Sequence, residues 1–70
     1  MIEAGQIYRD TYYDDINDGK QSHRTIRLVR IENDKAHAET ITDVFGRILE
    51  KPRKTRVSFK TLASGYERVA

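Results

Sequence analysis

The chain lacks cysteine and tryptophan, and among its 70 residues it has one proline and four glycines. Without cysteine it can form neither a disulfide nor a thiolate zinc site, which fits a reducing cytosol. No apolar run approaches the roughly 18 residues of a membrane span. The first five residues lack the basic and apolar regions of a signal peptide. We therefore expect a soluble, cytoplasmic protein that does not enter a membrane.

The length predicts a single domain over residues 1–70. A chain this short buries only about 60% of its unfolded surface, so a deep cleft with several buried catalytic groups is hard to fit beside a core. The sequence shows no Ser/His/Asp set and no glycine-rich phosphate-binding loop. These observations predict a protein that is not an enzyme and that uses no cofactor.

Five short segments have the composition and alternation of β-strands, and they lie at 6–10, 24–32, 35–43, 53–59 and 66–69. The segment 11–22 is rich in Asp, Asn and Gly and predicts a long loop with a turn near residues 17–19. Asn33-Asp34 predicts a tight turn between the second and third strands. The stretch 44–52 is expected to be a connection, with Pro52 at a strand edge or in a loop. Residues 59–64 suit a single 3₁₀ turn, ended by Gly65.

The strongest strand, 24–32, changes its alternation partway. Ile26 and Leu28 share one face, whereas Val29 and Ile31 share the other. Such a change inside one apolar run predicts a β-bulge or a sharply twisted strand. Five short strands also need closure into a barrel if no edge is to be left exposed.

This order of loops, with one helical turn before the last strand, is similar to the SH3-like small-barrel architecture of SH3, Tudor and KOW-type modules. Separately, the segments 5–10, 24–29, 54–58 and 66–69 resemble short proteins of actinobacteria and actinophages to which no activity has been assigned. The resemblance covers most of the chain. It implies an all-β fold, a small five-stranded SH3-like barrel with one short 3₁₀ turn before the last strand, and it implies no function.

Charge is spread unevenly along the chain. Residues 1–23 carry two basic and five acidic side chains, whereas residues 24–70 carry eleven and six. Between Arg47 and Lys60 there are six basic residues and only one acidic residue, Glu50. Spaced cations on a twisted sheet can bind successive phosphates, and the release of counterions favours such binding. The candidate phosphate-binding residues are Arg24, Arg27, Arg30, Lys51, Arg53, Lys54, Arg56 and Lys60. A solvated face without a ligand is the alternative interpretation of the same cations.

Aromatic side chains are candidates for stacking on nucleic-acid bases. Tyr8 and Tyr66 are better explained as half-buried residues with a solvated hydroxyl, and a core role is also favoured for Phe45. Tyr12 and Tyr13 are adjacent, so only one of them can point inward in an extended segment. The other is the preferred stacking residue.

The remaining polar features predict no metal site. The acidic segment 14–19 does not place its acids and glycine at the spacing of a calcium-binding EF-hand loop. The two histidines, His23 and His37, are isolated in the sequence and have no evident third ligand. Binding of Pro-rich peptides is not favoured either, because the tryptophan of the usual aromatic groove is missing.

The sequence thus favours a non-enzymatic binding module that contacts nucleic acid, either DNA or RNA, through a basic sheet face. The alternative is a protein-interaction adaptor of phage or mobile-element origin, which acts on a host protein or assembles with itself. It would use the acidic loop and the apolar residues of 44–49. Exposure of Val44, Phe45, Ile48 and Leu49 in the monomer would favour that alternative. The sequence does not indicate an oligomeric state.

Overall fold

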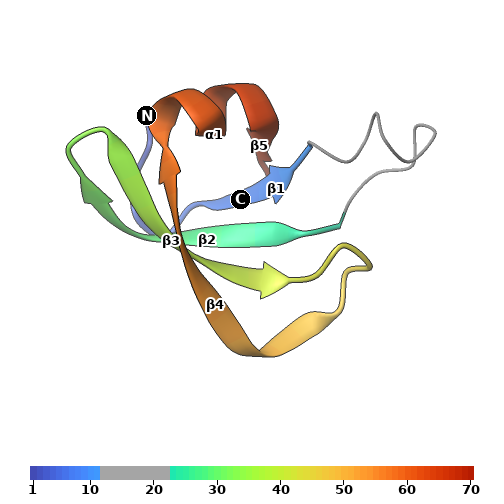
Figure 1. Ribbon diagram of the computed structural model, residues 1–70. Coiled ribbons are helices and arrows are strands. Elements are labelled where there is room, and N and C mark those ends of the chain that lie inside the picture. The colour runs from blue at the N-terminus through green and yellow to red at the C-terminus, as the bar shows by residue number, and fades with distance from the viewer. Residues whose placement is uncertain (12–22) are drawn as a thin grey trace.

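A computed structural model of the chain describes residues 1–11 and 23–70 (Figure 1). It contains strands β1 (Ile7–Asp10), β2 (Thr25–Glu32), β3 (Lys35–Thr42), β4 (Ile48–Ser58) and β5 (Tyr66–Arg68), and one helix, α1 (Phe59–Gly65). The strands form one antiparallel sheet in the order β4-β3-β2-β1-β5. The prediction of an all-β domain with five strands is confirmed. No helix in the described part of the chain is long and apolar enough to cross a membrane.

The two outer strands determine whether the sheet closes into a barrel. β4 and β5 are the two outer strands, and within residues 1–11 and 23–70 they form no ladder with each other. Helix α1 connects them and lies beside the sheet in Figure 1. Closure into a barrel is therefore not confirmed, and the likeness to SH3-like modules stays a prediction.

The core lies on one face of the sheet, beneath α1. Its buried members come from four of the strands and the helix, and they are Tyr8, Ile26, Leu28, Ala36, Ala38, Val57 and Leu62. Leu62 is the only residue of α1 that is buried, and it fixes the helix over the sheet. The small side chains of β3 leave room for the larger ones of β2 and α1, which suits a core of so few residues.

The predicted bulge in β2 is confirmed. Leu28 pairs with Ala38 and Arg30 pairs with His37, so Val29 is an extra residue without a partner of its own on β3. Its side chain is 51% exposed. The bulge lets Leu28 and Ile31 both face the core although they are three residues apart.

Two predicted connections differ from the structure. Residues 48–52, expected to lie in a loop, form the first part of β4, because a tight turn over residues 43–47 joins β3 directly to β4. Opposite residues 49–52 the β3–β4 register shifts, and Figure 1 shows β4 bending in its course. Pro52 is accommodated there because β4 is an edge strand, which is one of the two settings that the sequence predicted for it.

The predicted 3₁₀ turn at 59–64 is instead an α-helix of seven residues. Ser58 caps its first turn, since its Oγ accepts a hydrogen bond from the backbone N–H of Thr61 at 3.2 Å. This cap satisfies one of the N–H groups that a helix leaves unpaired at its start, and burial of Leu62 supplies the packing. Gly65, which was expected to follow the helical segment and end it, is instead the last residue of the helix.

Candidate nucleic-acid interface

The face of the sheet opposite the core, called here the outer face, brings together cations from β2 and β4 on either side of β3. Cross-strand register assembles its side chains in two rows, which are Arg27, Glu39 and Lys54, followed by Arg30, His37 and Arg56. The cations of β2 and β4, which lie far apart in the sequence, thus share one surface. The sequence alone left open whether they do.

The bulge at Val29 is the reason that Arg27 and Arg30 lie on the same face. In a regular strand, residues three positions apart point to opposite sides of the sheet. The extra residue restores the phase, so that Arg30 follows Arg27 on the outer face and Val29 is exposed between them. A feature of the backbone therefore assembles this part of the basic surface.

Carboxylates on the same face pair with both β2 arginines. Arg27 Nη2 lies 3.0 Å from Glu39 Oε2, and Arg30 Nη2 lies 3.2 Å from Glu32 Oε2. Both pairs are solvent-exposed, and such pairs contribute only about 0–1 kcal/mol. A phosphate group can therefore replace the carboxylate at little cost.

Glu32 also contacts His37. The distance from His37 Nε2 to Glu32 Oε2 is 2.8 Å, and the same nitrogen lies 3.2 Å from Arg30 Nη2. The hydrogen bond with His37, followed by the charge of Arg30, lowers the pKa of the Glu32 carboxyl below its ordinary value. Glu32 is thus held as a carboxylate, which partly neutralises this end of the outer face.

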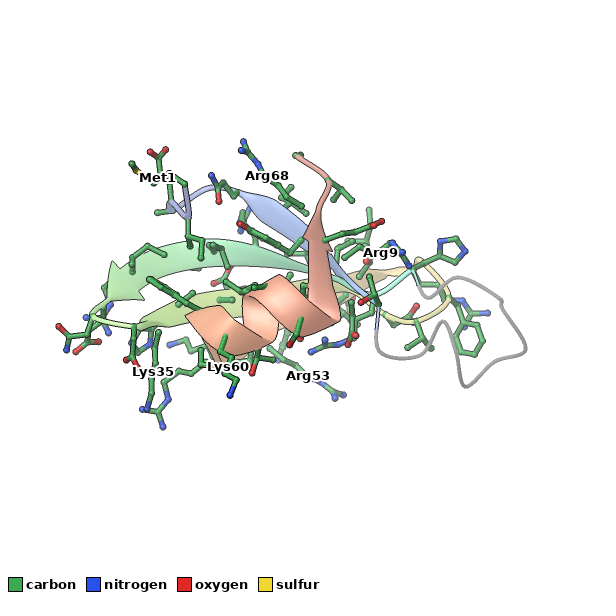
Figure 2. All side chains as sticks on the ribbon, turned by 90° about the horizontal axis from the view of Figure 1, so that it is seen from above. Met1, Arg9, Lys35, Arg53, Lys60 and Arg68 are labelled. Carbon is green, nitrogen blue, oxygen red and sulfur yellow. The ribbon has the colours of Figure 1, made fainter. Side chains whose placement is uncertain are left out.

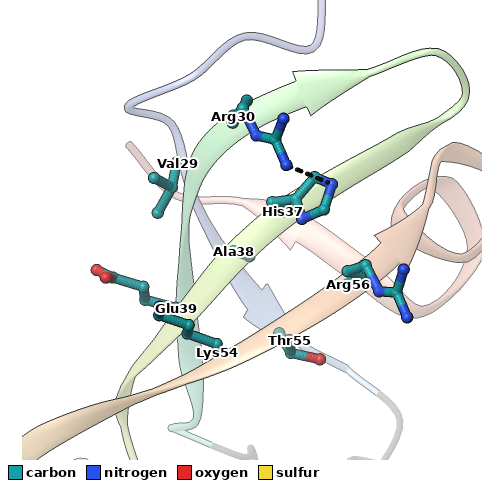
Figure 3. Close-up of a pocket in the computed structure, with 8 residues that line it drawn as sticks. All are labelled: Val29, Arg30, His37, Ala38, Glu39, Lys54, Thr55 and Arg56. Atoms are coloured by element: carbon teal, nitrogen blue, oxygen red, sulfur yellow. Dashed lines mark hydrogen bonds between the residues drawn. The ribbon is translucent and has the colours of Figure 1, made fainter.

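An open hollow lies on the outer face between β2, β3 and β4 (Figure 3). Its lining residues are Val29, Arg30, His37, Ala38, Glu39, Lys54, Thr55 and Arg56. Figure 3 shows Arg30 and His37 directed toward each other, with Arg56 on the neighbouring strand. The hollow combines a small apolar area with cations from two strands, and its carboxylate is Glu39.

The cations on β4 and α1 are accessible to solvent. Lys51, Arg53, Lys54, Arg56 and Lys60 are all exposed. Within residues 1–11 and 23–70, none of these five side chains has a carboxylate within ion-pair distance. Lys54 and Arg56 belong to the outer face. Arg53, which pairs with the buried Thr40, lies toward the other face at the sheet edge.

Figure 2 shows how the edge cations are distributed. Arg53, Lys60 and Lys35 lie along one border of the molecule, and Arg68 lies on the opposite side. Lys35 pairs with Ser58, two residues before Lys60, which brings the start of β3 next to the start of α1. The basic surface therefore extends from the outer face around the free edge of β4.

Arg24 is separate from this surface. Its Nη1 donates hydrogen bonds to Asp10 Oδ2 at 2.9 Å and to Tyr66 Oη at 3.1 Å, and its Nη2 donates to Thr40 Oγ1 at 3.1 Å. Burial lowers the pKa of the Arg24 guanidinium, but its interactions with Tyr66 and Asp10 outweigh burial, so the pKa is raised overall. The side chain joins β1, β3 and β5 rather than facing a ligand.

The aromatic side chains considered for base stacking lie in different environments. Tyr12 and Tyr13 lie outside the described residues. Tyr8 is buried, with its hydroxyl donating to Gln6 Oε1 at 3.0 Å. Phe45, for which a core role was favoured, is instead 75% exposed at the tip of the β3–β4 turn. That expectation was wrong because the turn brings residues 44–46 beyond the reach of the core.

The exposed turn was missed in the sequence, although a local signal for it is present. Asp43 and Gly46 are the residue types preferred at the first and fourth positions of a type I turn, and Gly46 has a φ of 84°. Asp43 Oδ1 accepts hydrogen bonds from the N–H groups of Phe45 and Arg47 at 2.9 and 3.0 Å. Ile48, the first residue of β4, is 85% exposed beside it.

Among residues 1–11 and 23–70, no three His, Asp or Glu side chains cluster as metal ligands would. Comparisons of this chain with protein-family models, with curated proteins and with solved structures gave no match. The functional argument therefore depends on the geometry and charge of the surface itself.

Proposed function

We propose that this protein is a non-enzymatic nucleic-acid-binding module that contacts phosphates through the outer face and the free edge of β4. Lys54 and Arg56 are the central contacts. Lys51, Arg53 and Lys60 extend the contact along the edge. Arg27 and Arg30 join by exchanging their carboxylate partners for phosphates, whereas Arg24 has a structural role.

The observation that carries this proposal is that the five exposed cations on β4 and α1 form no ion pairs within the described residues. Exposed cations close together repel one another, and a polyanion removes that repulsion while releasing its own counterions. The hollow on the outer face, which Lys54 and Arg56 line together with Arg30, offers a recess in which an anionic ligand could contact cations of two strands.

The test is the binding of labelled DNA and RNA, followed by fluorescence anisotropy at about 50 mM and about 200 mM salt. We expect affinity to fall steeply with salt. Arg56→Ala should weaken binding at low salt and reduce the slope of log affinity against log salt by about one. Arg68→Ala, which removes the same charge on the opposite side of the molecule, should leave both nearly unchanged. If none of the probes showed salt-dependent binding, the proposal would be refuted.

A second candidate function is a protein-interaction adaptor, and a specific observation favours it. Val44, Phe45 and Ile48 are 37%, 75% and 85% exposed, and they adjoin one another at the β3–β4 turn. Exposed apolar side chains in a group can mark a contact with a host protein or a second copy of the chain. Sedimentation over a wide concentration range tests self-assembly, which predicts a mass that rises with concentration and that falls back in Ile48→Ala.

A further inference from the structure

Phe45 presents an aromatic ring to solvent on a hydrogen-bonded turn. The turn beneath it is closed by two backbone hydrogen bonds, Gly46 N–H to Asp43 O and Asp43 N–H to Arg47 O, each 3.0 Å long. The Asp43 carboxylate satisfies two further N–H groups of the turn. On its other side the turn meets His23, whose N–H donates to Val44 O at 3.1 Å. A ring fixed in this way loses little conformational freedom when a ligand contacts it.

The surroundings of the ring are cationic. The guanidinium carbon of Arg47 lies 5.8 Å from the centroid of the Phe45 ring, which is within cation–π range. Lys51 follows four residues later, on β4. Of the two carboxylates between residues 43 and 51, that of Asp43 is engaged by the turn, which leaves that of Glu50 in the first part of β4. An anionic partner is therefore favoured at this tip over a neutral or basic one.

The Phe45 ring also lies at the start of the basic segment that runs from Arg47 to Lys60. Arg47, at the turn, is followed along β4 by Lys51, Arg53, Lys54 and Arg56, and the strand continues into α1 with Lys60. Proteins that bind single strands combine such a row of cations, which follows the phosphates, with an aromatic ring on which a base stacks. In a duplex the base faces are covered by neighbouring bases, so a ring on a projecting turn has no base face to contact.

From this juxtaposition we infer that the ligand is a single-stranded nucleic acid and that Phe45 is its base-stacking residue. The inference rests on the proposed nucleic-acid function and specifies its substrate class. The phosphates run along β4, and Arg47 contacts the phosphate next to the stacked base. An apolar protein partner at the same tip is the competing explanation, and the experiment separates the two.

The experiment uses the full chain and a labelled thymidine oligonucleotide of about 15 nucleotides, together with its duplex. Phe45→Leu keeps an apolar side chain but removes the ring, and Ile48→Ala changes the neighbouring exposed apolar residue. We expect Phe45→Leu to weaken single-strand binding about tenfold, with the salt dependence and duplex binding unchanged. Ile48→Ala should bind as the parent does. Both side chains are exposed, so thermal unfolding should show all three proteins equally folded.

A direct readout of stacking is available because the chain contains no tryptophan. The Phe45→Trp variant places a single indole at the tip, and a stacked base should quench its fluorescence in step with the anisotropy change. Binding without quenching, or an equal loss of single-strand and duplex affinity in Phe45→Leu, overturns the stacking inference and leaves the proposed function standing. No binding of either probe at low salt refutes both. Dimerisation that Phe45→Leu and Ile48→Ala both abolish assigns the tip to a protein contact instead.

Discussion

Arg24 Nη1 and Asp10 Oδ2 are 2.9 Å apart across the end of the sheet, and the Asp10 side chain is only 9% exposed. Through the same guanidinium, Tyr66 of β5 and Thr40 of β3 are joined to β1. β5 is only three residues long and pairs only with β1 in the described residues, so this polar cluster reinforces one of the weakest parts of the sheet.

Arg24→Leu should therefore destabilise the fold. The substitution removes the Arg24 guanidinium from the buried Asp10 carboxylate, and breaking a partly buried pair in this way costs about 2–3 kcal/mol. For a small domain that is a large share of the total stability. The measurement is the urea midpoint at constant slope. The control is Arg27→Leu, which removes the exposed pair with Glu39 and should cost less than about 1 kcal/mol. Equal effects of the two substitutions would contradict the structural role of Arg24.

Two neighbouring residues of β2, one buried and one exposed, give a second prediction. Leu28 is 1% exposed in the core, and Leu28→Ala should cost about 3 kcal/mol through lost burial and the cavity left behind. Val29 is exposed on the outer face, so Val29→Ala should change the free energy of unfolding by less than about 0.5 kcal/mol. Urea denaturation of both variants tests the placement of Leu28 in the core and of Val29 on the outer face.

The strands and the bulge could be predicted because they depend on local patterns. Alternation in 24–32 identified both the strand and the place where its phase changes, and Asn33-Asp34 identified the turn after it. The length of β4 could not be predicted in the same way. Residues 48–52 do not alternate, and they become a strand only because the turn at 43–47 places them beside the end of β3.

The site was less predictable than the fold, since it depends on which residues face each other. Arg24 and Arg27 look equivalent in the sequence, yet one lies in a polar cluster with Asp10 and the other on the outer face. Their roles diverge because Arg24 precedes β2 at a point where β1, β3 and β5 all present polar groups. Sequence spacing contains no information on such long-range partners.

The two glycines Gly46 and Gly65 should respond in opposite ways to alanine. Gly46 has a φ of 84°, and an added Cβ would approach His23 Cβ to 3.3 Å, so Gly46→Ala should destabilise by about 1–2 kcal/mol. Gly65 ends α1 with no atom within 4 Å of an added Cβ, and Gly65→Ala should be neutral or stabilise by up to about 1 kcal/mol. Thermal or urea unfolding measures both. A neutral Gly46→Ala would contradict the tight turn beneath Phe45.

Acid should remove the contribution of Glu32 to stability. Its pKa in the folded protein is lowered, first by the hydrogen bond with His37 and then by Arg30. The stabilisation is therefore fully present above the ordinary value of 4.5 and is lost as the pH falls through the lower folded value. The difference in urea midpoint between the parent and Glu32→Gln should therefore shrink as the pH is lowered from above 4.5 to below it. In a His37→Leu background the difference should already be smaller at neutral pH, and an unchanged difference would argue against the His37 contact.

Removing the carboxylates that partner the β2 arginines should strengthen nucleic-acid binding. Glu39→Gln releases Arg27, and Glu32→Gln releases Arg30, so each substitution adds a cation to the face that meets the phosphates. Because the released pairs are exposed and weak, we expect a gain of about two- to fivefold per substitution at low salt and a steeper salt dependence. Glu67→Gln is the matched control, since it makes the same change in net charge but acts on β5, at the edge of the sheet opposite β4, where Glu67 pairs with Arg9. Anisotropy titrations compare the three variants with the parent. If Glu67→Gln raised the affinity as much as the other two, net charge alone would explain binding, and the cations of β2 and β4 would have no special part in it.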